Sequence, residues 1–195
     1  MKNEPVVRLA VFAGLISAGA FMRIYFRELP NFAPIAAMAL FSGYYFRSAW
    51  VAALVPLLAM SLSDLFIGGY EWQTMMVVYG ALTLPVACRG WLRKYLAIER
   101  GSARSTIVGL GGLLSFSLAS SLLFYLTTNF ACWCFGTMYE QTWQGLLLSY
   151  QQAIPFFRNT LTGDLFFGAS LFGSYALAIN LGWAQGVKPV PAASA

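Results

Sequence analysis

The sequence predicts an all-α polytopic membrane protein with about six transmembrane helices arranged in one bundle. Of the 195 residues, 59% are hydrophobic and only 10% are charged, whereas a soluble domain carries roughly 25% charged residues. The mean hydropathy of +0.66 agrees with this. In addition, the apolar residues fall into six separated runs, and a run of about 20 such residues crosses the hydrocarbon core of a bilayer.

The six predicted spans follow one another with short connections, so we expect a single transmembrane domain over residues 1–187 and a disordered tail over 188–195. In chain order the spans cover residues 7–26, 32–46, 49–69, 74–88, 105–130 and 162–183. We interpret the first as a retained span and not a cleaved signal peptide, because its helical pattern continues past Ala18-Gly19-Ala20. The second is short, and partial re-entry into the bilayer is the alternative to a full crossing.

One segment between the last two spans differs in kind. Residues 137–159 mix polar side chains such as Glu140, Gln141 and Gln144 with apolar ones such as Trp143 and Phe157. This composition is typical of an amphipathic stretch at a membrane surface. It could form a binding loop or lid, or an interfacial helix without a ligand, and the sequence leaves both open.

The positions of the basic residues predict the orientation of the chain in the membrane. With six spans, nine of the twelve lysines and arginines lie on the side of the termini, and three lie on the opposite side. The three are Arg23, Arg27 and Arg158. Because basic residues accumulate on the cytoplasmic side, we expect a multi-pass protein of the bacterial inner membrane with both termini in the cytoplasm.

The composition also excludes several kinds of chemistry. The chain has no histidine, so it cannot supply a histidine-ligated haem or zinc site or a Ser-His-Asp triad. Cys132 and Cys134 are separated by a single residue, whereas a redox or zinc C-x-x-C motif has two residues between its cysteines. We interpret them, together with Cys88, as small apolar residues of the core. The net charge of +5 reports topology and not nucleic-acid binding. No nucleotide-binding or hydrolase motif is present, and we expect no catalytic residue, cofactor or resident metal.

Small residues spaced four apart mark faces where helices pack closely in lipid. The first span carries Ala10, Gly14 and Ala18 in this spacing. Taken alone, the pattern favours packing inside the protein over docking to a partner.

Two acidic residues lie within or at the edge of predicted spans, where ionisable groups are costly and usually functional. Asp64 is near the end of the third span and Asp164 is near the start of the sixth, and both precede the sequence Leu-Phe-x-Gly. The predicted topology brings both ends to the outer face, where Arg158 also lies. We therefore expect the three side chains to converge, either as a structural ion pair or helix cap or as a substrate contact.

Further polar and aromatic groups belong to the same outer side. They include Asn31, Trp72, Asn129 and Trp133. Tryptophan at this level is usually part of an interfacial belt. A shallow polar centre beneath aromatic loops would also suit an uncharged or zwitterionic, partly aromatic small molecule.

Three motifs carry a resemblance. PNFAPIAAMALFSG at residues 30–43, Ser63-Asp64 and IPFFRNTLTGD at residues 154–164 resemble an uncharacterised bacterial family of small membrane proteins. That family is similar to the substrate-binding S-components of energy-coupling-factor vitamin transporters, which share six spans, this length and a small-residue face on the first helix.

The resemblance implies a vitamin-like ligand bound between the outer loops and the outer halves of the later helices. It also implies a transmembrane coupling subunit, driven by two ATPases, that docks on an Ala-x-x-x-Ala face corresponding to Ala10, Gly14 and Ala18, with glycine replacing one alanine. The implied ligand-binding positions are Asn31, Trp72, Asn129, Trp133, Arg158, Asn159 and Asp164.

The first functional hypothesis is a binding subunit for uptake of a small micronutrient. The second is a structural or accessory subunit of a larger membrane complex, with small-residue faces packed against partner helices and no ligand of its own. A membrane enzyme that uses Asp64, Asp164 and Glu140 is the least favoured, because these acids show no close catalytic spacing.

Overall fold

The computed structural model describes residues 4–69, 71–96, 98 and 103–183, and all regular elements in this part of the chain are helices. The predicted tail at residues 188–195 lies outside the described residues. The elements are α1 (Glu4–Tyr25), α2 (Ile35–Tyr45), α3 (Ala49–Ile67), α4 (Trp72–Thr83), the short 3-10 helix η1 (Leu84–Cys88), α5 (Arg89–Tyr95), α6 (Ala103–Phe135) and α7 (Trp143–Asn180).

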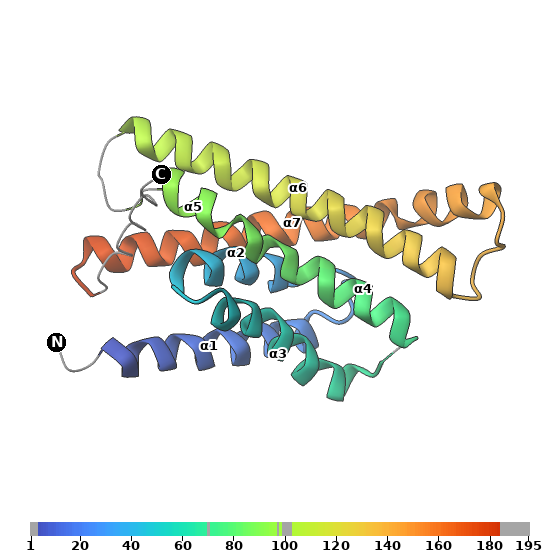
Figure 1. Cartoon of the computed structure of the whole chain (residues 1–195), viewed down its shortest axis with the longest axis horizontal. Helices are drawn as coiled ribbons and strands as arrows, with labels where there is room; N and C mark the ends of the chain where they lie inside the picture. The colour runs from blue at the N-terminus through green and yellow to red at the C-terminus, as the bar shows by residue number, and fades with distance from the viewer. Residues whose placement is uncertain (1–3, 70, 97, 99–102, 184–195) are drawn as a thin grey trace, which may run out of the picture.

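The helices form an elongated bundle in which successive long elements alternate in direction. In Figure 1, α1, α3 and α6 run from left to right, and α2, α4 and α7 return from right to left. As a result, α1 begins and α7 ends at the same end of the bundle. The connections α1–α2, α3–α4 and α6–α7 all lie at the opposite end, and this end carries the candidate site described below.

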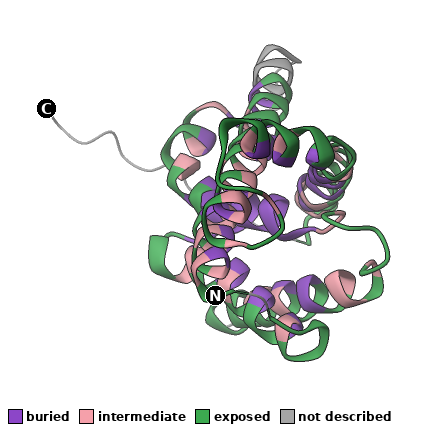
Figure 2. Ribbon diagram, turned by 90° about the vertical axis from the view of Figure 1, so that its right-hand side faces the viewer, coloured by how far each residue is buried: buried purple, intermediate pink, exposed green. Residues whose placement is uncertain are grey.

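The short helix α2 is the centre of the molecule and contacts every other helical element. Every residue from Ile35 to Tyr44 is buried, as expected for a helix that is apolar on all sides. Its small residues let neighbours approach closely: a Cβ on Gly43 would lie 3.3 Å from Val86 Cα. The buried Ser42 hydroxyl donates to the Ala52 carbonyl of α3 (2.9 Å). Figure 2 shows the buried residues gathered in the middle of the bundle, with exposed residues around them.

The carboxyl end of α2 is held by two arginines. Arg93 of α5 donates from Nε to the Tyr44 carbonyl (2.9 Å) and from Nη2 to the Phe46 carbonyl. Arg89 donates from Nη2 to the Arg47 carbonyl (2.8 Å). Carbonyls at the end of a helix lack partners within the helix, and these guanidinium groups supply the missing hydrogen bonds. Their positive charge also interacts favourably with the negative end of the helix dipole.

Within the described residues, four helical segments are long and apolar enough to cross a membrane. They are Glu4–Tyr25, Ala49–Ile67, Trp72–Tyr95 and Gly109–Phe135. The third is longer than the predicted fourth span over residues 74–88, because α4 continues through η1 into α5. The helix α2 is apolar but has only 11 residues.

The predicted division between a surface segment and a sixth span is wrong. Residues 143–180 form one continuous helix of 38 residues, α7, which includes Pro155. The connection to α6 is therefore limited to residues 136–142. Thr142 caps the helix: its hydroxyl accepts a hydrogen bond from the Gly145 amide (3.1 Å). Threonine at this position satisfies an amide that the first turn leaves free.

Candidate functional site

A cavity of about 530 Å³ lies at the end of the bundle that carries the α1–α2, α3–α4 and α6–α7 connections. Its wall is formed by the end of α1 and the following connection, the start of α2, and parts of α3, α4, α6 and α7. Small-molecule sites have volumes of about 300–1,000 Å³ and are lined mainly by apolar groups with a few polar ones. The cavity therefore has the size and the structural position of a ligand site.

Asp164 is the most deeply buried charged residue of the cavity wall, with 2% of its surface exposed. Its Oδ2 lies 2.6 Å from the Ser121 hydroxyl, which also lies 2.9 Å from the Ser117 carbonyl. A single hydroxyl proton can bond only one of these two oxygens at a time. The ion pairs between described residues join Arg8 to Glu4, Arg23 to Asp64 and Arg27 to Glu28, so none includes Asp164.

Thr74 of α4 also lines the cavity and is 3% exposed. Among the described residues its hydroxyl has no hydrogen-bond partner. Thr128 and Thr160 of the same wall differ, because their hydroxyls donate to carbonyls of their own helices, Phe124 (2.7 Å) and Phe156 (2.9 Å). A buried polar group without a partner costs free energy, so Thr74 is a natural contact for a bound polar atom.

Aromatic side chains make up much of the remaining wall. Phe26 and Phe32, from the end of α1 and the connection to α2, pack edge to face with ring centroids 5.2 Å apart. On the other side, Tyr125 of α6 and Phe157 of α7 have centroids 5.0 Å apart. The cavity is thus lined by aromatic rings as well as by Asp164.

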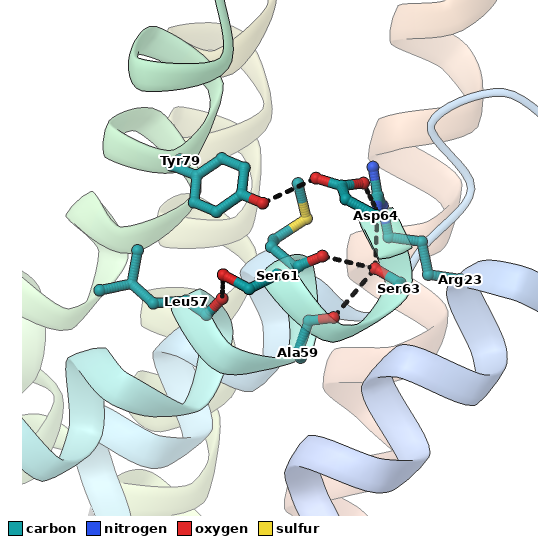
Figure 3. A network of polar contacts seen from close by, with 8 residues as sticks. Arg23, Leu57, Ala59, Ser61, Ser63, Asp64 and Tyr79 are labelled. Atoms are coloured by element: carbon teal, nitrogen blue, oxygen red, sulfur yellow. Dashed lines mark hydrogen bonds and ion pairs between the residues drawn. The ribbon is translucent and has the colours of Figure 1, made fainter. Parts of the chain in front are cut away.

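A second polar cluster adjoins the cavity through Arg23 and is drawn in Figure 3. Arg23 of α1 pairs with Asp64 of α3, and its Nη1 also donates to the Ser63 hydroxyl (2.6 Å). The Tyr79 hydroxyl of α4 donates to the other oxygen of Asp64 (2.7 Å). The two charged side chains are 18% and 7% exposed. The cluster links three helices, and Arg23 is its member that lines the cavity.

The expected convergence of Asp64, Asp164 and Arg158 does not occur. Asp64 pairs with Arg23, and Asp164 contacts Ser121. Arg158 is exposed on α7 and forms no ion pair with any described residue. The six-residue offset from Arg158 to Asp164 explains this, because side chains that share a helix face are three or four residues apart.

Three of the predicted ligand-binding residues line the cavity: Asn31, Asn129 and Asp164. Asn31 adopts a left-handed backbone conformation (φ 64°) in the α1–α2 connection, which asparagine tolerates better than most residues. The Asn129 amide donates to the Tyr125 carbonyl (2.7 Å) of its own helix.

The other predicted residues lie outside the cavity wall. Trp72 is 70% exposed at the start of α4. Trp133 donates from its indole nitrogen to the Glu140 carbonyl (2.9 Å), and Asn159 donates to the Pro30 carbonyl (3.0 Å). The last two therefore hold the α6–α7 and α1–α2 connections in place around the site. Near the Asn159–Pro30 contact, α7 lies close to the α1–α2 connection, since a Cβ on Gly163 would lie 3.3 Å from the Ala33 amide nitrogen.

Among the polar residues of this region that sequence reasoning missed are Arg23, Thr74, Tyr79 and Ser121. Arg23 had a usable signal, because an arginine inside an apolar span is costly and usually has an acidic partner. The other three carry no signal in the sequence, since a hydroxyl group becomes informative only when its neighbours are known. Cys132 lines the cavity and Cys134 is exposed.

The small-residue stripe of α1 faces outward. Ala10, Gly14 and Ala18 are exposed, and a Cβ on Gly14 would meet no atom within 4 Å. The buried face of α1 consists of Leu15, Gly19 and Ala20. The prediction that this stripe packs inside the protein is therefore wrong. Docking of the stripe to a partner stays a prediction.

The fold and site together define an all-helical protein with several helices suited to a membrane and a cavity at one end of its bundle. The chain belongs to DUF6580, a family of unknown function, which it matches over residues 3–185. No curated protein and no solved structure has significant similarity to it. The resemblance to S-components stays a prediction.

Proposed function

We propose that the protein is a substrate-binding membrane subunit for uptake of a small, vitamin-like micronutrient, energised by a separate coupling module. One observation carries the proposal: a cavity of ligand size contains two buried polar groups, Asp164 and Thr74, whose bonding capacity the described residues leave largely unused. A protein without a ligand gains nothing from such groups, because burying them costs free energy.

The proposed location is the bacterial inner membrane, with six crossings formed by α1, α2, α3, the α4–α5 segment, α6 and α7. The exposed residues on the side of the bundle support the proposal that lipid surrounds the protein. Leu110, Leu114, Leu118 and Leu122 follow one another along α6 and are each 45–56% exposed. Such an apolar ridge is unfavourable in water and suits contact with lipid chains. The distribution of basic residues supports cytoplasmic termini, with the cavity at the outer side.

The proposed ligand contacts are Asp164, Asn129 and Asn31, to which the cavity geometry adds Thr74. Trp133 and Asn159 would act on binding through the connections that they hold. The exposed face of Ala10, Gly14 and Ala18 would dock to the coupling subunit, because small side chains let a partner helix approach closely.

The alternative is a structural or accessory subunit of a larger membrane complex. The same exposed stripe on α1 favours it, since that surface fits any closely packed partner helix. It predicts co-purification with a stoichiometric partner other than an ATPase-driven coupling subunit, and a cavity that holds no specific small molecule.

Native mass spectrometry of the detergent-purified protein separates the two functions. The transport hypothesis predicts a bound small molecule that is released on activation in the gas phase. Protein that carries only lipid and detergent, together with an unrelated stoichiometric partner, would favour the accessory role.

A substitution at Thr74 tests whether the molecule occupies the cavity. Thr74→Val keeps the shape of the side chain and replaces its hydroxyl by a methyl group, so stability should be unchanged or higher because a buried unpartnered polar group is lost. Ligand affinity should fall by about 3- to 10-fold. Thr127→Val is the matched control. Thr127 lies on α6 outside the cavity wall, and its hydroxyl donates to the Leu123 carbonyl of the same helix.

A further inference from the structure

We infer that the ligand of this cavity carries a positively charged nitrogen on an aromatic or apolar body, and that Asp164 binds the nitrogen. The inference rests on the proposed function and names the chemical class of the ligand. It also changes the expectation drawn from the loops alone, which allowed an uncharged molecule.

The first step is the charge of Asp164. Its side chain is withdrawn from water, and its one hydrogen-bond partner among the described residues is the neutral Ser121 hydroxyl. A buried carboxylate is stable only when a cation or several donors compensate it. Ser121 shares its proton with the Ser117 carbonyl and supplies at most one donor, so the compensation is incomplete.

The second step is that the arginines near the cavity do not supply the missing charge. Arg23 is paired with Asp64. Arg27 is paired with Glu28 at the exposed rim, and Arg158 is exposed on the outside of α7. Two acids line the cavity, Glu71 and Asp164, and neither belongs to an ion pair between described residues. Glu71 is exposed at the start of α4, where water solvates its charge. Asp164 is therefore the buried acid of the cavity that an incoming cation can neutralise without breaking an ion pair of the protein.

The third step is the nature of the surrounding wall. Phe26, Tyr125 and Phe157 line the same cavity, and aromatic faces attract organic cations. Calcium takes six to eight oxygen ligands and magnesium six, and zinc is held by three or four cysteine, histidine or acidic side chains. The described residues contain no group of three or more acidic, cysteine or histidine side chains that could hold a metal ion. The volume of about 530 Å³ also exceeds what a single inorganic ion fills.

The test uses three probes that share a phenyl ring and a two-carbon tether and differ in the charge of the terminal group: phenethylammonium, phenethyl alcohol and 3-phenylpropanoate. Each is added to the full-length protein in lipid nanodiscs, and the midpoint of thermal unfolding is measured. We expect a rise of about 3–6 °C at a saturating concentration of phenethylammonium, and no comparable rise with the other two probes.

Two variants connect the effect to the residue. Asp164→Asn keeps the size of the side chain and removes its charge, so the response to phenethylammonium should be lost. Glu140→Gln is the matched control, because it removes an exposed acid from the α6–α7 connection, outside the cavity wall, and should leave the response intact.

A second readout keeps the test independent of the folding of the Asp164 variant. Cys132 lines the cavity, so in a Cys88→Ser, Cys134→Ser background its alkylation by N-ethylmaleimide should slow at least several-fold in phenethylammonium alone. Equal protection by the alcohol or the carboxylate would overturn the inference. So would a response retained in Asp164→Asn, or one reproduced by sodium chloride, which would indicate an inorganic cation site.

The inference and the proposed function fail separately. A co-purified molecule that is neutral or anionic would overturn the cation assignment and leave the binding function standing. If no molecule co-purifies, the binding function loses its support, while a charge-selective response that depends on Asp164 would still establish the cation site.

Discussion

At the scale of single residues, the contrast between Arg23 and Arg27 shows how burial decides the value of a charge. Both arginines lie near the end of α1 and both pair with an acid. The Arg23 and Asp64 side chains are 18% and 7% exposed, whereas those of Arg27 and Glu28 are 64% and 86% exposed. Removing one partner of a buried pair leaves an uncompensated charge away from water, and an exposed pair has no such penalty.

We therefore expect Arg23→Gln to lower the free energy of unfolding by about 3–5 kcal/mol. Arg27→Gln, the control four residues away, should lower it by less than about 1 kcal/mol. Denaturant unfolding in detergent, followed by circular dichroism, measures both. Equal effects of the two substitutions would show that the Arg23–Asp64 pair does not connect α1 and α3 in the folded protein.

Residue identity predicted part of the site. Asp64 and Asp164 could be singled out because acids are costly in apolar helices, and both are almost fully buried in polar clusters. An acidic partner for Arg23 was predictable, but the specific pairs Arg23–Asp64 and Ser121–Asp164 were not, because they join residues 41 and 43 positions apart in sequence. Such contacts depend on the rotation of each helix about its axis, which hydropathy does not report.

At the scale of elements, the end of α2 depends on α5. The central helix stops at Tyr45, where its carbonyls would be buried without partners, and Arg93 donates to the carbonyls of Tyr44 and Phe46. Satisfying these groups allows an 11-residue apolar helix to end inside the protein.

Arg93→Ala should therefore destabilise the protein by about 1–3 kcal/mol, since it leaves buried carbonyls unpaired. Lys94→Ala removes a neighbouring positive charge whose ammonium lies 5.2 Å from the centre of the Tyr95 ring, and should cost less than about 1 kcal/mol. The shift in thermal midpoint compares the two variants. An effect of Arg93→Ala no larger than that of Lys94→Ala would contradict the role of Arg93 at the end of α2.

The presence of the helices was predicted better than the residues at which they begin and end. The apolar runs at residues 7–26 and 49–69 correspond closely to α1 and α3, because a long apolar segment without polar interruption has few alternatives. Residues 137–159 were misread because Gln, Arg and Asn side chains suggest a surface. A helix can continue through such residues when only one side of it packs against the bundle, as α7 does.

At the scale of the whole molecule, the alternation of helix directions brings three connections and the cavity to one end. The positions of basic residues predict that this end faces outward in the membrane. Two exposed positions at opposite ends of the bundle can report this: Thr137, in the α6–α7 connection, and Ala49, at the start of α3.

In a background with the native cysteines replaced by serine, we expect Thr137→Cys to react with a membrane-impermeant maleimide on intact cells. Ala49→Cys should react only after the inner membrane is permeabilised. The reverse labelling pattern would show that the orientation is inverted. Labelling of both positions on intact cells would contradict the three crossings proposed between them, by α3, the α4–α5 segment and α6.

The sequence by itself determined the helical class, the apolar surface and the two acids worth attention, because composition and hydropathy are properties of consecutive residues. The tertiary structure decided which charges are paired, which face of α1 is free and which residues share a cavity. It also placed α2 at the centre, where short length and small side chains fit among all the other helices. These properties depend on how helices rotate and pack against one another, and residues distant in the chain jointly determine them.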